Sequence, residues 1–204
     1  MKASLWIPSI TFAMALNSTT STPMSYAQVT PATPPVVAEA PLRVSNSFHF
    51  VVNAPLSEAA PLFGPEGERS WAGKHWNPEF LYPRPSPDAV ARKIPEPALD
   101  IQGAVFTIQH GPYKSVWVNT VFDLAAGRMQ YVAFVPGLMV SIIDVRLTST
   151  GPATTGVEVT YARTALDPSA NDEVRAHGDN DRGSALEWQQ AIEASLKERR
   201  QKAP

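Results

Sequence analysis

The chain has 204 residues, which is long enough for one domain with a buried core. Hydrophobic residues make up 44% and charged residues 18%, a composition typical of a globular protein rather than a disordered one. The formal charge of −2 gives no reason to expect nucleic acid or an anionic membrane surface as a partner. Cysteine is absent, which excludes disulfides, thiolate zinc sites and thiol nucleophiles.

The first 27 residues have the pattern of a secretory signal peptide. Lys2 precedes an apolar run over residues 5–16, which is shorter than the about 20 residues that span a bilayer. Small residues at Ser25 and Ala27 indicate a cut after Ala27. We therefore expect a periplasmic or secreted protein with no integral membrane segment in the mature chain. The alternative is a disordered N-terminus on a cytoplasmic protein.

Residues 28–42 are rich in Pro, Ala and Val, and we expect a linker there, before a folded domain over residues 43–204. The domain opens with a strand at residues 43–52, which are rich in Val and Phe. Residues 56–63 fit a short helix. Residues 64–68 are interpreted as an exposed acidic turn, and the alternative is paired-carboxylate chemistry at Glu66 and Glu68.

The next stretch carries aromatic residues and then many prolines. Residues 71–76, W-A-G-K-H-W, fit a second short helix or the opening of a strand. Residues 78–97 contain six prolines, a density that no central strand tolerates. A long loop is therefore expected there, with a brief strand near residues 89–94.

Five strand patterns joined by short turns follow the loop. They cover residues 104–109, 115–123, 129–135, 140–148 and 157–164. Parallel pairing would need crossover segments that this stretch lacks, so the pattern predicts an antiparallel meander. Residues 168–183 are polar, and Asn171 is a candidate cap for an early part of the last helix.

Residues 184–200 form the clearest amphipathic helix of the chain. Ser184 and Glu187 have the spacing of a capping box. An apolar stripe at spacings of three and four is made by Ala185, Trp188, Ile192 and Leu196. Burying its three large side chains should contribute roughly 1.5–3 kcal/mol each. We therefore predict an α+β fold in which a curved antiparallel sheet of about six or seven strands wraps around this long C-terminal helix and leaves a cavity between them.

The stretch from Leu62 to Pro78, L-F-G-P-E-G-E-R-S-W-A-G-K-H-W-N-P, resembles a signature of bacterial START-like proteins. These belong to the SRPBCC superfamily, which groups polyketide cyclase/dehydrase-like and lipid-transport-like proteins. Shorter matches are Gly103–Phe106, Tyr131–Gly137, Val157–Tyr161, Thr164–Leu166 and Trp188. The resemblance covers roughly residues 43–200. It implies a helix-grip fold with a deep apolar cavity for lipids, sterols, polyketides or other hydrophobic ligands, but it does not imply one activity.

Eight residues are candidates for contact with a ligand in such a cavity: Trp71, His75, Trp76, Phe106, Trp117, Tyr131, Tyr161 and Trp188. Aromatic side chains there offer apolar area, and their O–H and N–H groups orient a ligand. The alternative for each is a place in the solid core. His75 is also a candidate for acid–base catalysis, and the alternative is a half-buried histidine that packs beside tryptophan. His49, in the first strand, faces either the cavity or solvent.

The remaining polar candidates suggest no metal site. His110 is interpreted as a turn residue. His177, Asp179 and Asp181 are close in sequence, but their spacing matches neither a calcium loop nor a zinc helix pair, so a solvated loop is expected. We accordingly expect no metal and no cofactor.

Three functions remain open from the sequence. The first is binding or carriage of a hydrophobic small molecule such as a lipid, a sterol or a polyketide-like compound. The second is a cyclase or dehydrase type of enzyme that uses the same cavity, with His75 as acid–base group. The third is a protein-interaction module that displays the Pro-rich loop. The pattern leaves the oligomeric state open.

Overall fold

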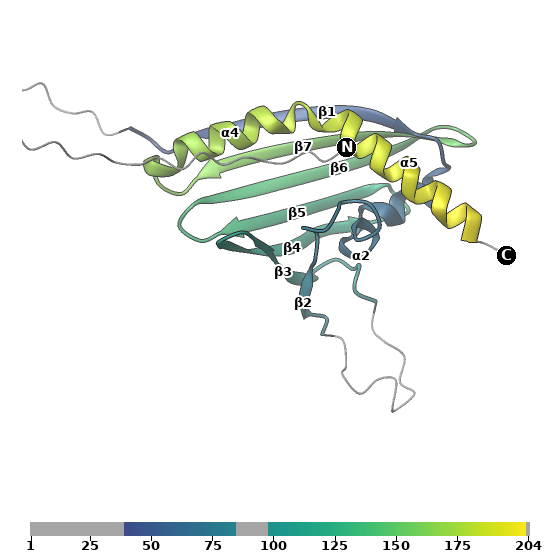
Figure 1. Cartoon of the computed structure of the whole chain (residues 1–204), viewed down its shortest axis with the longest axis horizontal. Helices are drawn as coiled ribbons and strands as arrows, with labels where there is room; N and C mark the ends of the chain where they lie inside the picture. Colours follow the sequence, from purple (N-terminus) through teal and green to yellow (C-terminus); the bar gives the residue numbers. More distant parts are fainter. Residues whose placement is uncertain (1–38, 85–97, 203–204) are drawn as a thin grey trace, which may run out of the picture. The chain divides into compact units, whose positions relative to one another are not determined.

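A computed structural model of the chain describes residues 39–84 and 98–202 (Figure 1). The expected signal peptide at residues 1–27, most of the expected linker and the brief strand expected near residues 89–94 lie outside the described residues. Within the described part, no helix is both long and apolar enough to cross a bilayer.

A seven-stranded antiparallel sheet forms the body of the fold, with strand order β1-β7-β6-β5-β4-β3-β2. Its strands are β1 (Arg43–Val52), β2 (Glu79–Tyr82), β3 (Val105–His110), β4 (Tyr113–Asp123), β5 (Arg128–Val135), β6 (Met139–Gly151) and β7 (Thr154–Ala165). Strands β3 to β7 follow one another as neighbours, so the predicted meander is confirmed. The first strand closes the order by pairing with the last one.

The helical segments lie on one face of this curved sheet (Figure 1). They are α1 (Leu56–Ala59), the 3-10 helix η1 (Ala60–Phe63), α2 (Pro65–Glu68), the 3-10 helix η2 (Pro168–Ala170), α4 (Asn171–Asp181) and α5 (Ser184–Lys202). The predicted fold, a curved antiparallel sheet around a long C-terminal helix, is therefore confirmed.

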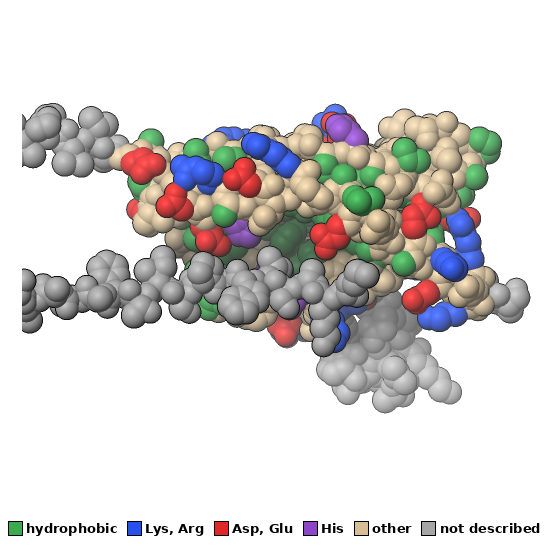
Figure 2. Space-filling view, turned by 45° about the horizontal axis from the view of Figure 1, so that its top comes forward, with side chains coloured by type: hydrophobic (Ala, Val, Ile, Leu, Met, Phe, Trp, Pro, Cys, Tyr) green, Lys and Arg blue, Asp and Glu red, His purple; other side chains and the backbone are tan. Residues whose placement is uncertain are grey.

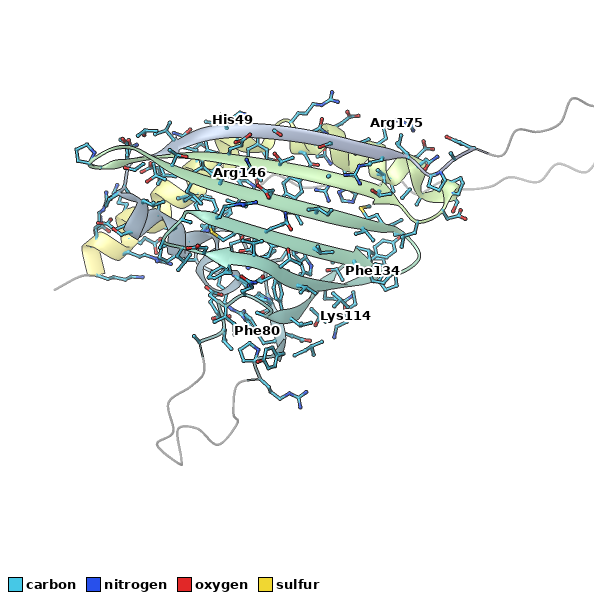
Figure 3. All side chains as sticks on the ribbon, turned by 180° about the vertical axis from the view of Figure 1, so that it is seen from behind. His49, Phe80, Lys114, Phe134, Arg146 and Arg175 are labelled. Carbon is cyan, nitrogen blue, oxygen red and sulfur yellow. The ribbon has the colours of Figure 1, made fainter. Side chains whose placement is uncertain are left out.

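Strand alternation decides which side chains face the helices. In β1, Phe48 and Phe50 are buried while His49 between them is exposed. Figure 3 shows His49 and Arg146 on the outer face of the sheet, away from the helices. A period of two places successive side chains on opposite faces, so the inner face collects the apolar residues.

The stripe predicted for the final helix faces the sheet. Ile192 and Leu196 of α5 are buried, and Trp188 is half-buried against the same core. The Trp188 ring meets Phe48 of β1 edge-on, with ring centroids 5.3 Å apart. Burial of this stripe holds α5 on the sheet.

Three local expectations before β3 were wrong. Residues 64–68 form the short helix α2 rather than an exposed turn, and residues 71–76 form turns rather than a helix or strand. Strand β2 lies inside the segment expected to be a loop. Proline is tolerated on both sides of it because β2 is the edge strand of the sheet, where missing N–H donors break few ladder hydrogen bonds.

Residues 168–183, where a polar stretch with a solvated loop around residues 177–181 was expected, form η2 and α4. Asn171 does not cap a helix, because its side chain holds the chain leading into β1: its Oδ1 accepts from Leu42 N (2.7 Å) and its Nδ2 donates to Ala40 O (3.0 Å). At the start of α5 the expected capping box is replaced by a hydrogen bond from Ser184 Oγ to Asn180 O (3.3 Å).

Candidate functional site

Indole N–H groups fix the segment that carries the START-like signature. Trp71 Nε1 donates to Leu62 O (2.7 Å), and Trp76 Nε1 donates to Pro65 O (2.8 Å). These carbonyls lie in η1 and at the start of α2, where short helices leave acceptors unpaired. The two tryptophans therefore stabilise the segment with their polar edges while their ring faces remain available for packing.

The helix α2 is positioned by a carboxylate from a distant segment and by one glycine. Asp100 accepts hydrogen bonds from Glu66 N (2.9 Å) and Gly67 N (3.4 Å). A Cβ on Gly67 would lie 1.9 Å from Pro61 O, so only glycine allows α2 to pack this closely on η1. This packing sets the direction in which the next residue, Glu68, projects.

A cavity of about 510 Å³ lies between the inner face of the sheet and the helices. Figure 2 shows a hollow with hydrophobic side chains at its floor, below the band of helices. The sheet contributes residues from β4, β5, β6 and β7, and the opposite wall comes from the α2 region, α4 and α5. The apolar and small lining residues include Trp71, Trp76, Trp117, Ala133, Ile143, Val145, Trp188 and Ala191.

One aromatic group of the cavity is centred on Trp188 of α5. Its ring centroid lies 5.0 Å from that of Trp71 and 6.4 Å from that of Tyr161 on β7. All three side chains line the cavity. Helix and sheet thus meet through aromatic rings, which offer a flat apolar surface to a ligand.

A second aromatic group is centred on Trp117 of β4. Its ring lies 5.4 Å from Trp76 and 6.3 Å from Tyr131, and these three line the cavity. Phe106 stacks under Trp117 at 5.9 Å and is fully buried. Phe106 therefore supports the wall from behind and does not itself line the cavity.

Glu68 is a buried carboxyl at the cavity wall, with 7% of its surface exposed. Burial raises its pKa well above the ordinary value of 4.5, and the nearby carboxylate of Asp100 raises it further. Both causes act in the same direction because each penalises the charged form. The prediction of an exposed acidic turn was therefore wrong for Glu68.

Two tyrosine hydroxyls share this part of the cavity. The Tyr131 hydroxyl donates its hydrogen bond to the carbonyl oxygen of Phe63, so it has no second proton to donate to a ligand. Burial raises the pKa values of both Tyr131 and Tyr161, and the charge that Glu68 would carry raises both further. Glu68, Tyr131 and Tyr161 all line this one cavity, so the charge of any one of them affects the others.

A buried ion pair lies elsewhere in the cavity wall. Arg163 of β7 donates from Nε and Nη2 to both oxygens of Asp181 (2.9 Å and 2.6 Å), and from Nη1 to Ser141 Oγ (3.1 Å). The two ionic side chains are 13% and 7% exposed. The guanidinium also lies 4.5 Å from the ring centroid of Tyr161. The bidentate geometry compensates the charge of Arg163 within the protein.

Two histidines, His177 and His110, line the cavity. His177 of α4, expected in a solvated loop, is half-exposed and contacts Glu173 at 3.4 Å. Desolvation lowers the pKa of His177, and the charge of Arg163 lowers it further. His110, expected in a turn, is the last residue of β3. In residues 39–84 and 98–202, no group of three or more His, Asp or Glu side chains is arranged to hold a metal ion.

The structure brings together six of the eight ligand-contact candidates in one cavity: Trp71, Trp76, Trp117, Tyr131, Tyr161 and Trp188. Phe106 lies behind the wall, and His75 is exposed on the turn between the two signature tryptophans and does not line the cavity.

Sequence reasoning missed the burial of the ionisable residues Glu68, Arg163 and Asp181 at this site. Glu68 belongs to the quoted signature, but its neighbours in sequence give no sign that it is buried. Arg163 had a usable signal, because it lies two residues after Tyr161 in a strand and therefore faces the same side. Its partner Asp181 was expected in a solvated loop, whereas it is buried in α4.

No family model matches the chain, and no curated protein matches it in sequence. Solved structures do match in three dimensions. Norcoclaurine synthase from Thalictrum flavum matches with a TM-score of 0.55 at 9% identity over 78% of this chain and 88% of that chain. Its complex with dopamine and hydroxybenzaldehyde matches with a TM-score of 0.52 at 10% identity, over 88% and 100%. The Mll3558 protein from Rhizobium loti has a TM-score of 0.50 at 15% identity, over 77% and 99%.

At these identities the likeness establishes the fold. The neighbours share the sheet and the C-terminal helix described above, and they are START-like helix-grip proteins. The resemblance found in the sequence is confirmed at that level: the chain has the helix-grip fold of the START-like proteins.

Proposed function

We propose that the protein binds, and by doing so carries, a hydrophobic small molecule in the cavity between the sheet and α5. The observation that supports this most strongly is the cavity of about 510 Å³ with its two aromatic groups. Sites for small molecules commonly measure roughly 300–1,000 Å³ and are lined mostly by apolar and aromatic side chains with few polar groups. Removing apolar ligand surface from water would supply the affinity.

The shape of the lining favours a guest with ring systems. Trp188 and Trp71 present one aromatic surface, and Trp117 with Trp76 presents another. A flat apolar ligand between them would gain ring contacts beyond its buried area. The norcoclaurine synthase structure with the same fold holds dopamine and hydroxybenzaldehyde, which are small aromatic molecules.

Filling the cavity tests this proposal. Ala191 lines the cavity, whereas Ala194 on the same helix is exposed. We expect A191F to weaken binding of the apolar dye Nile red by roughly tenfold or more, because the added ring takes the space of the guest, whereas A194F should bind as the wild type does. Equal dye binding by wild type and A191F would contradict the proposal. Independently of the dye assay, native mass spectrometry of the purified wild type would identify any co-purified molecule.

An acid–base enzyme of the cyclase or dehydrase type is the second candidate, and the burial of Glu68 in the cavity favours it. A carboxyl with a raised pKa suits proton transfer near neutral pH. The exposed position of His75 gives no such support. Turnover by wild type that is lost in E68Q while ligand binding is kept would favour this function over carriage.

We also propose that the chain is exported and cut after Ala27, on the pattern of residues 1–27. Expression of the full chain in a Gram-negative host and N-terminal sequencing of the product tests this. A mature end at Gln28 in the periplasmic fraction is expected, and a cytoplasmic product that keeps residues 1–27 would contradict it.

A further inference from the structure

Glu68 is held in place by its backbone rather than by its side chain. Its N–H donates to Gly64 O (2.8 Å), and its carbonyl accepts from Trp71 N (3.0 Å) and Ala72 N (2.8 Å). Asp100 fixes the start of the same helix through two other backbone N–H groups. The side chain is therefore aimed at the cavity by contacts that do not involve its carboxyl group.

The carboxyl itself has no hydrogen-bond partner among the described residues. Burial and the charge of Asp100 account for its raised pKa, and no hydrogen bond contributes to the shift. Among the described residues, Asn119 Oδ1 is the side-chain atom that is fully buried and lacks a hydrogen-bond partner. The two oxygens of Glu68 therefore keep some accessible surface. A buried polar group of this kind costs free energy unless something satisfies it.

The hydroxyls of Tyr131 and Tyr161 are not hydrogen-bonded to the carboxyl of Glu68, so that carboxyl can bind a guest. Tyr131 uses its proton on the carbonyl of Phe63. Tyr161 lines the same cavity, and no hydrogen bond contributes to its raised pKa either. Tyr161, and Glu68 when it is protonated, therefore present O–H donors within walls of aromatic carbon. A neutral carboxylic acid and a phenol in the wall of one cavity favour an oxygen acceptor over an apolar atom.

We propose that Glu68, as a neutral carboxylic acid, is the polar anchor of the cavity and donates a hydrogen bond to a carbonyl-type oxygen on an aromatic guest. The inference rests on the proposed binding function and specifies its ligand class: flat, largely apolar molecules that carry a ketone, aldehyde or quinone oxygen at one end. Arg163, whose charge Asp181 compensates, and the acidic residues Glu173 and Glu187 line the same cavity, so a cationic guest is the alternative that the test below must separate.

Two matched probes test the anchor. The ketone 2-acetylnaphthalene and the alkene 2-isopropenylnaphthalene have nearly the same shape, but only the ketone carries an acceptor. Their dissociation constants are measured by quenching of tryptophan fluorescence on the full chain. The quantity of interest is the ratio of the two constants, compared between wild type and variants as in a double-mutant cycle.

Substitution by an apolar isostere should remove the preference for the ketone. In E68L we expect the ratio to shift toward the alkene by roughly tenfold, the factor for loss of one buried hydrogen bond. E68Q keeps an N–H donor and should keep the ratio within about threefold. The control E66Q removes a partly exposed carboxyl from the same helix and should leave the ratio unchanged. An unchanged ratio in E68L, with the fold verified by circular dichroism, would overturn the proposal.

The pH dependence separates an acceptor guest from a cationic one. Asp100, Tyr131 and Tyr161 interact electrostatically with Glu68 from other elements, and the other titratable or charged groups that line the same cavity are His110, Arg163, Glu173, His177 and Glu187. Ketone binding should weaken as the pH rises and Glu68 ionises. A naphthylmethyl-trimethylammonium probe that binds more tightly than the ketone, strengthens with pH and depends on Glu68 would overturn the proposal.

The two proposals fail in different ways. If both naphthalene probes bind wild type but E68L leaves their ratio unchanged, the cavity binds hydrophobic molecules and the assignment of Glu68 is wrong. If neither probe nor Nile red binds wild type, the proposed function itself is wrong, and the assignment of Glu68 falls with it.

Discussion

The free energy of unfolding should depend on pH through Glu68, and the substitution E68Q isolates that dependence. Glutamine has the size and shape of a protonated glutamic acid but cannot ionise. In the folded protein the pKa of Glu68 lies well above the ordinary value of 4.5, because the side chain is buried and Asp100 lies nearby. In the unfolded chain both influences disappear.

The sign of the effect follows from proton binding. Because the folded state holds the Glu68 proton more tightly than the unfolded state, the resulting stabilisation is complete below the unfolded-state pKa. It is lost as the pH rises through the folded-state pKa. Between these two values one proton separates the states, so the unfolding free energy of wild type should fall by about 1.4 kcal/mol per pH unit relative to E68Q.

Urea denaturation of both proteins at half-unit intervals from pH 4.5 to 8 measures this difference. Asp100, whose pKa is also raised by burial, contributes a slope of the same sign, but it is present in both proteins and largely cancels in the comparison. E66Q is the control for removal of a carboxyl from the same helix. Curves for wild type and E68Q that run parallel over the whole range would refute the account of Glu68 given above.

Three further changes probe the packing around the site, each measured by urea denaturation. D181N should lower the free energy of unfolding by about 3–5 kcal/mol because it leaves the buried guanidinium of Arg163 without its carboxylate. D172N, in an exposed ion pair, should lower it by no more than about 1 kcal/mol. Equal losses in the two variants would contradict the stabilising role of the buried pair. G67A should lower the free energy of unfolding by about 3 kcal/mol or more, since its Cβ would lie 1.9 Å from a backbone carbonyl oxygen. In the control G183A the nearest atom to the added Cβ is 3.7 Å away, so the stability should hardly change. W71F removes one N–H donor and should cost about 1–2 kcal/mol; no change would mean that this hydrogen bond does not stabilise the segment.

The strands and the final helix were predictable because their signals are local. The predicted strand at residues 43–52 coincides with β1, and Ile192 and Leu196 are buried as their helical spacing predicts. Alternation and helical periodicity both follow from the geometry of the backbone, so a single sequence carries them.

The burial of Glu68 and Asp181 was not predictable because its causes are distant in sequence. The helix α2 is fixed by Asp100, which lies 34 residues after Glu66, and no local pattern near Glu68 signals that contact. Arg163 is buried with Asp181, 18 residues further on. His75 lies between two indoles in the sequence, but the turn at residues 71–76 leaves it exposed. Adjacency in sequence was there a poor guide to adjacency in space.

The hydrogen bonds from Trp71 and Trp76 to the backbone have a consequence for recognition. A free indole on a turn can adopt several rotamers, and a molecule that settles against it must suppress that motion. Here each ring is tethered at its nitrogen to a carbonyl of the preceding short helices, so its orientation is set during folding. The receptor surface is consequently preorganised, and selectivity among candidate molecules should depend more on how their outlines fit rigid walls than on how far those walls can adapt.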